Sequence, residues 1–582
     1  MYIKERPINQ EVLEHLIENE ISPVMAKLWA SRGIHHASEL SLQITQLIPP
    51  NDLKGCQEAA QYLAQALAEN RKIVIVADYD CDGATACAVG ILGLEELGQS
   101  FNSQIDFIVP NRFTMGYGLT PEVVELAANR NPRPEIIITV DNGIASIDGV
   151  AYANRLGIDV IVTDHHLPAD ELPKAKHIVN PNQPGCAFSS KALAGVGVMF
   201  YLLLATRAEL RDHYKLFTKQ TQPQLLNLLD LVALGTVADV AQLDRNNRIL
   251  VSAGLKRIRQ GLMSPGIEAL FHIAGKSLRE ANTFDLGFSL GPRLNAAGRL
   301  ADMTLGIQCL LSKDLTQAKR LAHDLDQMNR ERRSIENEMK VSAQTTMAQL
   351  SVEGRHALTL FEPSWHQGVI GILASRLKDE YHRPVIVFAL AEEKMPDGKG
   401  ILKGSGRSIT GFHMRDALDW ISKKYPQMIL KFGGHAMAAG LSIPEEDLAS
   451  FEQAFAKIAL QWIEPDALNR TIMHDGTLPL AQMNQQFAEQ LSTAIWGQGF
   501  PEPVFVGRFE VIKQTTLKGR HLKVELMPIE NGSSNQDSQS ISGIWFGHSE
   551  NLPPQTYLAY RLLVDHYLNY PRLQIHIETA FN

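Results

Sequence analysis

The chain has 582 residues, of which 45% are hydrophobic and 20% charged, and its formal net charge is −9 at pH 7. At ~100–200 residues per domain, this length predicts about three to five domains with ordinary globular cores. The acidic balance does not favour a general binder of polyanions, although local basic clusters can build a positive groove on an acidic protein.

Neither a membrane anchor nor an exported protein is expected. No run of ~18 apolar residues occurs, and the first residues, "MYIKERPINQEVLEHL", lack the apolar core of a secretory signal. The cysteines form no CxxC pair, which argues against a zinc ribbon or a disulfide framework. They are Cys56, Cys81, Cys87, Cys186 and Cys309. A reducing cytoplasm is the expected location.

Residues 1–50 predict a helical lead-in, because apolar positions in "NQEVLEHLIENE" recur at helical spacing. Between residues 51 and 311, continuously apolar strands alternate with helices. The strands are expected at "KIVIVADYD", "EIIITVDNG" and "DVIVTDHH", and the helices at "ATACAVGILGLEELG" and "SIDGVAYANRLG". Unbroken apolar strands are typical of parallel strands covered on both faces. This region therefore predicts an α/β domain with a doubly wound parallel sheet.

Three further regions are expected. Residues 312–350 are polar, with apolar residues at helical intervals. They form either an amphipathic surface helix or a long connecting helix, and the change of composition across them favours the connector. Residues 351–463 predict a second, smaller α/β domain, with Gly-rich basic turns after "PVIVFALAE". Residues 464–582 contain short strands of alternating polarity, which predict a C-terminal, OB-like β-barrel or a sandwich.

All three strands of the first α/β domain end in acidic residues. These ends carry Asp78, Asp80 and Asp82, then Asp141, and then Asp164, His165 and His166. Ligands of open parallel sheets bind beyond the carboxyl ends of the strands, so these side chains should converge. Crowded carboxylates repel each other unless a cation offsets them. Oxygen ligands with imidazole and no thiolate favour magnesium or manganese, and the number of acids suggests two ions, which suit phosphate-ester hydrolysis.

Each motif also has a simpler interpretation. "DYDCDG" resembles the start of a calcium loop, but the glutamate expected six residues after the glycine is replaced by Val89. "VDNG" alone is a strand followed by a turn, and paired histidines alone could cap a strand. Asp239, in "LGTVADV", is a fourth candidate acid, and the pattern alone leaves a helix N-cap equally open.

Taken together in this order and spacing, "DYDCDGATA", "TVDNG", "TDHH" and "LGTVADV" resemble the DHH phosphoesterase family. "KGSGRS" and "FGGHAMAAGLS" resemble its DHH-associated domain. The resemblance covers most of residues 50–460, and the β-rich tail points to the single-strand-specific exonuclease branch. It implies 5′→3′ degradation of single-stranded DNA to 5′-mononucleotides in recombination and repair. The alternatives are a phosphodiesterase for short oligonucleotides or cyclic dinucleotides, and a non-enzymatic replication scaffold.

The resemblance also implies roles for the acidic strand ends. The expected metal ligands are Asp78, Asp80, Asp82, Asp141, His165 and Asp239, with Asp141 bridging two ions and Asp78 binding directly or through water. His166 is expected to face the scissile phosphate, so that His166, Asp141 and His165 are the catalytic set. Asp164 would orient a neighbour rather than bind an ion. Many relatives with small substrates have a histidine where this chain has Val76, which leaves the division of acids between the ions open.

Basic and hydroxyl side chains are expected to hold substrate phosphates without reading sequence. In the second domain these are Ser405, Arg407, Ser408 and His435, with His366 a weaker candidate; in the first domain they are Arg112, Arg293 and Arg299. By resemblance, Ser405 and Arg407 hold the 5′-terminal phosphate or one near it. Without the resemblance, tight turns with solvated charges are the less favoured alternative for the second-domain set.

The tail carries basic residues close to aromatic ones. Lys513, Lys518, Arg520 and Lys523 lie near Phe505, Phe509 and His521 in the sequence. This mixture favours a strand-binding groove in which bases stack on rings, and a solvated charged face is the alternative. The expected partners are single-stranded DNA, a single-strand-binding protein and a RecQ-type helicase, with the chain itself a monomer and no membrane involved.

Overall fold

The computed structural model describes residues 1–112, 115–349, 354–530, 533–534, 539–565 and 571–581. These form two compact units. Unit 1 contains Met1–Lys4 and Gln327–Ile472, and unit 2 contains Glu5–Asp326 and Met473–Asn582. The expected domain boundary at residues 350 and 351 lies outside the described residues.

The centre of unit 2 is a five-stranded sheet in the order β3-β2-β4-β5-β6, with every neighbouring pair parallel. Its strands are β2 (Ile73–Ala77), β3 (Ile105–Ile108), β4 (Ile136–Val140), β5 (Asp159–Thr163) and β6 (His177–Val179). β2 and β4 are buried at every residue, as their unbroken apolar sequences predict. Because β2 lies between β3 and β4, the chain crosses from β2 to β3 on one side and then returns from β3 past β2 to β4 on the other. The β2–β4 gap is therefore the switch point at which open sheets bind ligands.

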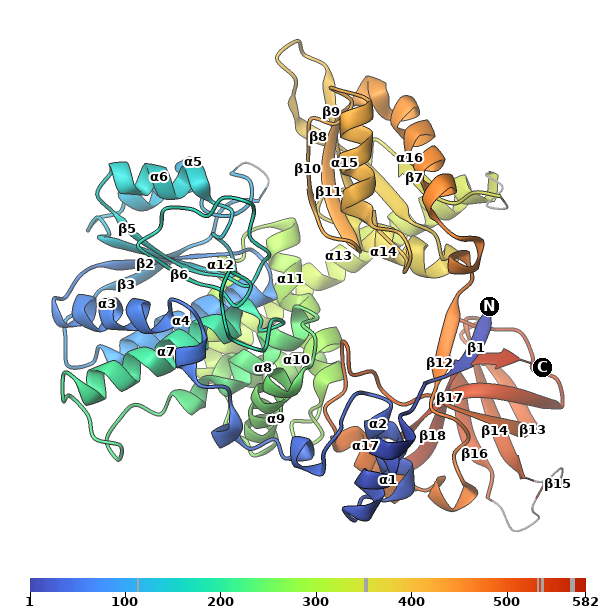
Figure 1. The fold of residues 1–582 in the computed structure, drawn as a ribbon. Coiled ribbons are helices and arrows are strands. Elements are labelled where there is room, and N and C mark those ends of the chain that lie inside the picture. Colours follow the sequence, from blue (N-terminus) through green and yellow to red (C-terminus); the bar gives the residue numbers. More distant parts are fainter. Residues whose placement is uncertain (113–114, 350–353, 531–532, 535–538, 566–570, 582) are drawn as a thin grey trace. The chain divides into compact units, whose positions relative to one another are not determined.

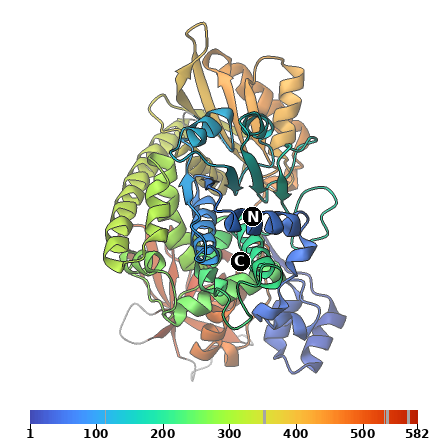
Figure 2. The same cartoon turned by 90° about the vertical axis from the view of Figure 1, so that its left-hand side faces the viewer.

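Helices cover both faces of this sheet, which confirms the doubly wound prediction (Figures 1 and 2). α5 (Pro121–Ala128) and α6 (Ile147–Arg155) pack on one face through Val123, Val124 and Val150. The other face carries α3 (Cys56–Ala68), α4 (Cys81–Leu97) and α7 (Gly195–Asp212).

A helical layer continues unit 2 beyond the sheet. It comprises α8 (Leu229–Ala238), α9 (Arg245–Arg259), α10 (Pro265–Ala274), the π-helical segment η5 (Asp285–Leu290), α11 (Gly291–Leu300) and α12 (Thr304–Leu311). The expected long helix is present as α13 (Leu315–Gln349). Within the described ranges, none of the helices combines the length and hydropathy that a membrane span requires.

Unit 1 is built on a mixed sheet in the order β10-β11-β9-β8-β7. The strands are β7 (Leu358–Phe361), β8 (Val385–Lys394), β9 (Gly400–Arg407), β10 (Lys431–Gly434) and β11 (Ala438–Pro444), and the helices are α14 (Ile370–Tyr381), α15 (Met414–Lys424) and α16 (Leu448–Trp462). The predicted basic turn at "KGSGR" is wrong, because these residues form β9. Gly404 fits a strand because a Cβ there would lie 2.5 Å from the Phe388 ring.

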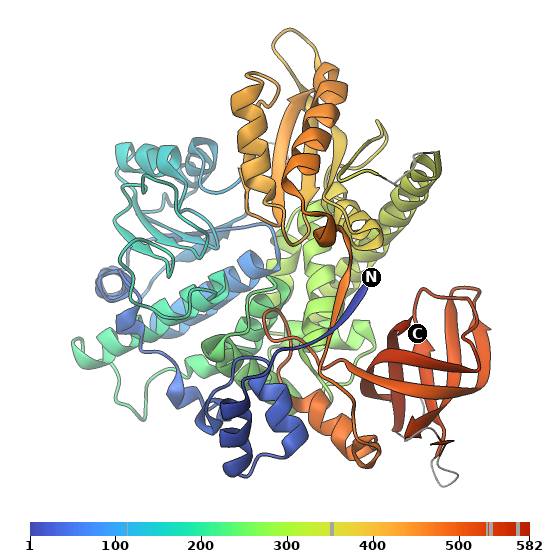
Figure 3. The ribbon, with the colours of Figure 1, turned by 45° about the vertical axis from the view of Figure 1, so that its right-hand side comes forward.

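The tail of unit 2 closes into a five-stranded barrel, shown in red in Figure 3. Its strands are β13 (Phe505–Leu517), β14 (His521–Glu530), β16 (Ile541–Trp545), β17 (Gln555–Asp565) and β18 (Arg572–Phe581), with the short β15 (Ser533–Ser534) paired to β14. The order β13-β14-β16-β18-β17-β13, with β16 and β18 parallel, confirms the OB-like barrel.

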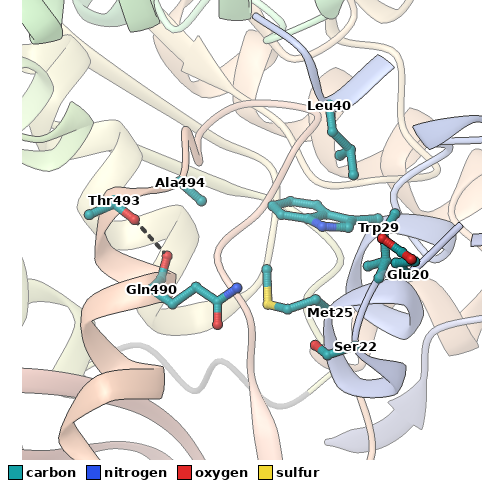
Figure 4. A pocket seen from close by; sticks show the side chains of 9 residues that line it. Glu20, Ser22, Met25, Trp29, Leu40, Gln490, Thr493 and Ala494 are labelled. Carbon is teal, nitrogen blue, oxygen red and sulfur yellow. Dashed lines mark hydrogen bonds between the residues drawn. The ribbon is translucent and has the colours of Figure 1, made fainter. Parts of the chain in front are cut away.

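From Glu5 onward the amino-terminal lead-in belongs to unit 2, where it packs beside this barrel. It contains α1 (Gln10–Glu18) and α2 (Pro23–Ala30), and β1 (Tyr2–Glu5) pairs with β12 (Thr471–His474). A pocket of about 560 Å³ lies between α2 and α17 (Gln485–Thr493). Figure 4 shows its Trp29 indole between Leu40 and Met25. None of the residues expected to bind metal lines this pocket.

Candidate metal centre

The carboxyl ends of β2, β4 and β5 meet at one edge of the sheet. The Asp78 amide donates to the carbonyl of Val140 at 3.3 Å, and the Asp141 amide donates to that of Thr163 at 3.1 Å. The acidic segment after each strand is therefore hydrogen-bonded, through the amide of its first acid, to the last residue of the neighbouring strand. The convergence that the sequence predicts at this edge is present, because parallel pairing aligns the strand ends.

Among the residues that the structure describes, three groups of side chains have ligand atoms within 4.8 Å of one another. The groups are Asp82–His165–Asp239, Asp78–Asp80–Asp141 and Asp141–His165–His166. Asp141 belongs to two of them, as does His165. The geometry thus offers two adjoining positions for cations with Asp141 between them.

Asp141 is the most constrained of these acids. It is 1% exposed and has a left-handed φ of 61°. Its Oδ1 atom lies 3.0 Å from His165 Nε2, yet accepts no hydrogen bond from any described residue. Burial and the charges of Asp82 and Asp80 raise the pKa of Asp141 well above its usual value. A buried carboxylate oxygen whose hydrogen-bonding capacity is unsatisfied, beside further carboxylates and an imidazole, belongs to the kind of donor set that a hard divalent cation prefers.

Asp82 is held by the first turn of α7. The amides of Gly195 and Val196 donate to its two carboxylate oxygens at 2.7 and 2.9 Å. Burial and the charge of Asp80 outweigh these bonds and raise its pKa to about 7. A Cβ on Gly235 of α8 would lie 3.0 Å from Asp82 Oδ1, so the glycine allows this close packing.

The loop after β2 is positioned by α4 and α11. Asp80 caps α4 by accepting from the Gly83 amide at 3.0 Å. The Cys81 amide donates to Oδ1 of Asn295 at 2.8 Å, and a Cβ on Gly298 would lie 1.8 Å from the carbonyl oxygen of Tyr79. Sequence reasoning singled out Arg293 and Arg299 in this part of the chain, and missed Asn295 and Gly298 as the supports of this loop.

Asp164 organises the two histidines. Its Oδ1 accepts from the amides of His165 and His166 at 2.7 and 3.1 Å and lies 2.7 Å from His166 Nδ1. Its other oxygen accepts from the Ile144 amide. Burial lowers the pKa of His166, but the hydrogen bond and charge of Asp164 outweigh it and raise that pKa to about 9. The Tyr117 hydroxyl, which sequence reasoning also missed, lies 3.4 Å from this ring.

Asp239 reaches the cluster from the end of α8. It is the C-terminal cap of that helix, so the N-cap alternative is wrong; Asp244 caps the next helix instead. Asp239 Oδ2 lies 3.8 Å from His165 Nε2. Burial and the charge of Asp82 raise the pKa of Asp239 well above its usual value.

The three arginines expected to hold phosphate in unit 2 have different surroundings. Arg112 lies over the Tyr79 ring, 4.4 Å from its centroid, and donates to the Gly298 carbonyl at 3.3 Å. Arg293 is buried and paired with Asp326 at 2.9 Å. Arg299 is half-buried in the last turn of α11.

In unit 1, Arg407 and Ser405 lie together on β9. The Arg407 guanidinium donates to Ser405 Oγ at 3.1 Å. A Cβ on Gly371 would lie 3.0 Å from that oxygen and 3.1 Å from Arg407 Nη2, so both side chains lie against the first turn of α14. A guanidinium, a hydroxyl and a helix N-terminus are the donors that bind phosphate.

The other candidates in unit 1 are less clearly placed for a ligand. Ser408 is buried and donates to the Phe412 carbonyl at 2.7 Å. His435 is exposed between β10 and β11. His366 precedes α14, and its Nδ1 accepts from the Gly368 amide.

The basic residues of the barrel are exposed, but two of the predicted stacking rings are not available. Lys518 and Arg520 lie in the β13–β14 loop and Lys523 on β14, which are parts of an OB barrel that contact nucleic acids. Lys513 is exposed on β13. The prediction that Phe505 and Phe509 stack bases is wrong, because alternation along β13 buries both inside the barrel. Phe546, which sequence reasoning missed, is exposed and 5.4 Å from the His521 ring.

Comparison with known proteins finds similarity along the whole chain. Residues 72–236 match the DHH family, N-terminal domain, residues 353–463 the DHHA1 domain and residues 474–579 the RecJ OB domain. The single-stranded-DNA-specific exonuclease RecJ of Escherichia coli (strain K12) is 46% identical over 97% of this chain and 96% of its own length. Its counterpart in Haemophilus influenzae is 45% identical over 99% and 98%. The crystal structure of RecJ in complex with Mn²⁺ from Thermus thermophilus has a TM-score of 0.79 and 27% identity, covering 100% of this chain and 79% of that one.

Proposed function

The chain belongs to the RecJ family of single-stranded-DNA-specific exonucleases, and we propose that it degrades single-stranded DNA from the 5′ end to 5′-mononucleotides in recombination and repair. Its cofactors are two divalent cations, Mn²⁺ or Mg²⁺, as in the solved RecJ complexes with these metals. One observation carries this proposal: Asp141 is shared by two groups of ligand atoms at the switch point of the sheet.

Asp82, His165 and Asp239 would hold one cation, and Asp78 and Asp80 the other, with Asp141 between them. Asp82–His165–Asp239 and Asp78–Asp80–Asp141 are groups whose ligand atoms lie within 4.8 Å, and a further group joins Asp141 to His165 and His166. The bound pair supplies activation of water and stabilisation of charge on the phosphate. The carboxylates also favour it, because a bound cation would offset the mutual repulsion that burial and neighbouring acids impose on Asp82, Asp141 and Asp239.

Asp164 and His166 act on the substrate side of the cluster. Asp164 fixes His166 through Nδ1 and through the main chain, so the imidazole has one orientation. His166 would hold the scissile phosphate, with Tyr117 packed edge-on against its ring. Asp164 then has the positioning role of a residue that orients ligands and catalytic groups.

Ser405 and Arg407 would hold the 5′-terminal phosphate at the first turn of α14, with Ser408, His435 and His366 around them. Arg112, Arg293 and Arg299 would contact further phosphates. Lys513, Lys518, Arg520 and Lys523 would guide the strand along the barrel. Phosphate contacts position a strand without reading its sequence, so digestion is expected to be nonspecific.

The chain is further proposed to work as a monomer in the cytoplasm, with a single-strand-binding protein and a RecQ-type helicase as partners. An enzyme restricted to single strands needs another protein to open a duplex. All five cysteines are free, which suits a reducing compartment. Light scattering of the purified protein, alone and with each partner, tests these associations.

Digestion of one strand labelled at either end tests the function. With Mn²⁺, label at the 5′ end should be released first as a mononucleotide, and a blunt duplex or an RNA strand should be cut far more slowly. Efficient cutting of blunt duplex, or release from the 3′ end, would contradict the proposal. Preference for a dinucleotide or cyclic dinucleotide over a long strand would favour the phosphodiesterase alternative.

A further inference from the structure

Two phenylalanines are exposed side by side at the π-helical segment η5, Phe284 as the residue before it and Phe288 within it. Phe284 is 57% and Phe288 67% exposed, and their rings stack at a centroid distance of 4.7 Å. The intervening and following residues Asp285, Leu286 and Leu290 are buried. Phenylalanine is usually an interior residue, so an exposed stacked pair is informative. The spacing of four residues brings both rings to the outer face of this segment.

This pair is attached to the helix that delivers Asp239. A Cβ on Gly287 would lie 3.3 Å from the Val237 side chain, so η5 packs on the last turn of α8. Val240 follows Asp239 directly and is 62% exposed. From the 3.8 Å spacing of consecutive Cα atoms, the main chain of Phe288 is within about 20 Å of Asp239. At ~3.4 Å per stacked nucleotide, that distance corresponds to at most about six nucleotides.

The surroundings of the pair suit a polyanion. Lys276 Nζ lies 5.9 Å from the Phe284 ring centroid and pairs with Asp285 at 2.9 Å. Arg279 is exposed on the same connection between α10 and η5. Aromatic faces beside basic side chains are the usual composition of a surface that binds single strands without sequence preference.

We propose that Phe284 and Phe288 form a stacking platform for bases of the single-stranded substrate, up to about six nucleotides 3′ of the phosphate being cut. The proposal rests on the proposed exonuclease function and adds a base-binding site to it. Bases stack on aromatic rings whatever their sequence, so the platform would raise affinity while leaving digestion nonspecific. A dinucleotide offers at most one base 3′ of the phosphate being cut, so it should depend least on the platform.

Single abasic positions test the platform directly. KM and kcat are measured with Mn²⁺ on 5′-phosphorylated 12-residue strands that carry one abasic position each, and on a dinucleotide. For the wild-type protein, an abasic residue at one or two of the first six positions should raise KM roughly 5- to 100-fold. Phe284→Ala/Phe288→Ala should raise KM on the intact strand by a similar factor, with kcat and dinucleotide cleavage unchanged. In this variant, the abasic position should no longer matter.

Two further variants separate stacking from a structural effect. Phe288→Trp should keep the wild-type KM, whereas Phe288→Leu should raise it, because only the ring can stack. Tyr214→Ala is the matched control, because Tyr214 is an aromatic residue that is 39% exposed and lies far from the metal centre. It follows the carboxyl end of α7, which is about 27 Å long. Gly195, at the opposite end of α7, is the residue whose amide donates to Asp82. An abasic penalty that persists in the double alanine variant overturns the platform alone. A wild-type protein without exonuclease activity overturns the proposed function, and the platform with it.

Discussion

Nε2 of His165 lies 3.0 Å from Oδ1 of Asp141, and this oxygen accepts no hydrogen bond from the described part of the chain. The two residues follow the neighbouring parallel strands β5 and β4. Gly195 confines the carboxylate further, because a Cβ there would lie 2.7 Å from the same oxygen. The fold therefore fixes an acceptor in place that no hydrogen bond from the described residues satisfies, which is the arrangement expected of a metal ligand.

Asp141→Asn should abolish exonuclease activity, by a factor on the order of 1,000 or more, because both cation positions lose a shared oxygen. Mn²⁺ should raise the melting temperature of the wild-type protein by several degrees, since a ligand at 100 times its Kd stabilises by about 2.7 kcal/mol. The variant should lose most of this shift. Thermal melting with EDTA and with Mn²⁺ checks both statements.

The variant should remain folded without metal, because the substitution relieves repulsion among buried carboxylates. Asp106→Asn is the matched control. Asp106 lies on β3 of the same sheet but pairs with Arg130 at an exposed position, where an ion pair contributes little. Its activity and metal response should equal those of the wild-type protein. Normal digestion by Asp141→Asn would overturn the assignment of the centre.

Asn295→Ala should lower activity by roughly 10- to 100-fold, because supports of ligands commonly have effects of this size. The Cys81 amide loses its acceptor, and the loop that carries Asp80 and Asp82 is no longer held against α11. Asn295→Asp keeps an acceptor oxygen and should retain more activity. Steady-state digestion across a range of Mn²⁺ concentrations should show that the alanine variant needs more metal.

Asn484→Ala provides the comparison for Asn295→Ala. Asn484 also binds a main-chain amide, that of Phe487, but it caps α17 and lies outside the metal groups. Its loss should cost about 1 kcal/mol of stability and leave the metal requirement unchanged. Equal metal requirements in both variants would show that Asn295 is only a structural residue.

Sequence patterns predict the convergence of the acids that directly follow apolar strands, because the order of these strands along the chain is plain. They do not predict the sheet order, which places β2 beside β4 and so brings Asp78 and Asp141 together. They also miss Asn295 and Gly298, since their contacts with the β2–α4 loop join segments more than 200 residues apart, as for Cys81 and Asn295 with a separation of 214. Such contacts arise from tertiary packing and leave no local signal.

The errors have equally specific causes. Glycines in "KGSGR" favour turns by propensity, yet they lie in β9 because large neighbours such as Phe388 fill the space. Phe505 and Phe509 share an inward face of β13, which could not be distinguished from an outward face before the barrel topology was known. The exposure of Phe284 and Phe288 could not be predicted, because phenylalanine at these positions is equally compatible with a buried helix face.

Arg407→Lys should reduce the preference for a 5′-phosphorylated strand over a 5′-hydroxyl strand. Lysine keeps the charge but loses the planar fork that donates to Ser405 and to a phosphate together. The loss should be about 10-fold in kcat/KM on the phosphorylated strand, with little change on the hydroxyl strand. The measurement is kcat/KM of the wild-type protein and of the variant on the phosphorylated strand and on the hydroxyl strand.

Arg415→Lys is the control for Arg407→Lys, because Arg415 is exposed on α15 of the same unit. It should keep the wild-type preference. A preference that also survives in Arg407→Lys would indicate that the terminal phosphate is bound elsewhere.

His576, on β18 of the barrel, should make the protein less stable in mild acid. Burial and the charge of Arg561 lower its pKa to about 4, against 6.5 in the unfolded chain. Between about pH 6.5 and 4, His576 is therefore protonated in the unfolded chain but remains neutral in the folded protein. Stability is fully present above about pH 6.5 and falls as the pH drops toward 4. At ~1.4 kcal/mol per unit, the loss from this group between pH 7 and 5 is about 2 kcal/mol.

His576→Gln removes the titrating group and should make the barrel less sensitive to acid. The measurement is amide hydrogen exchange of β17 and β18 at pH 7 and 5, corrected for the intrinsic exchange rate, because this reports the barrel separately from the rest of the chain. Between pH 7 and 5, protection should fall in the wild-type protein and fall by a smaller amount in the variant. Equal losses in the two proteins would mean that His576 is protonated as readily in the folded barrel as in the unfolded chain, so that its burial beside Arg561 carries no energetic consequence.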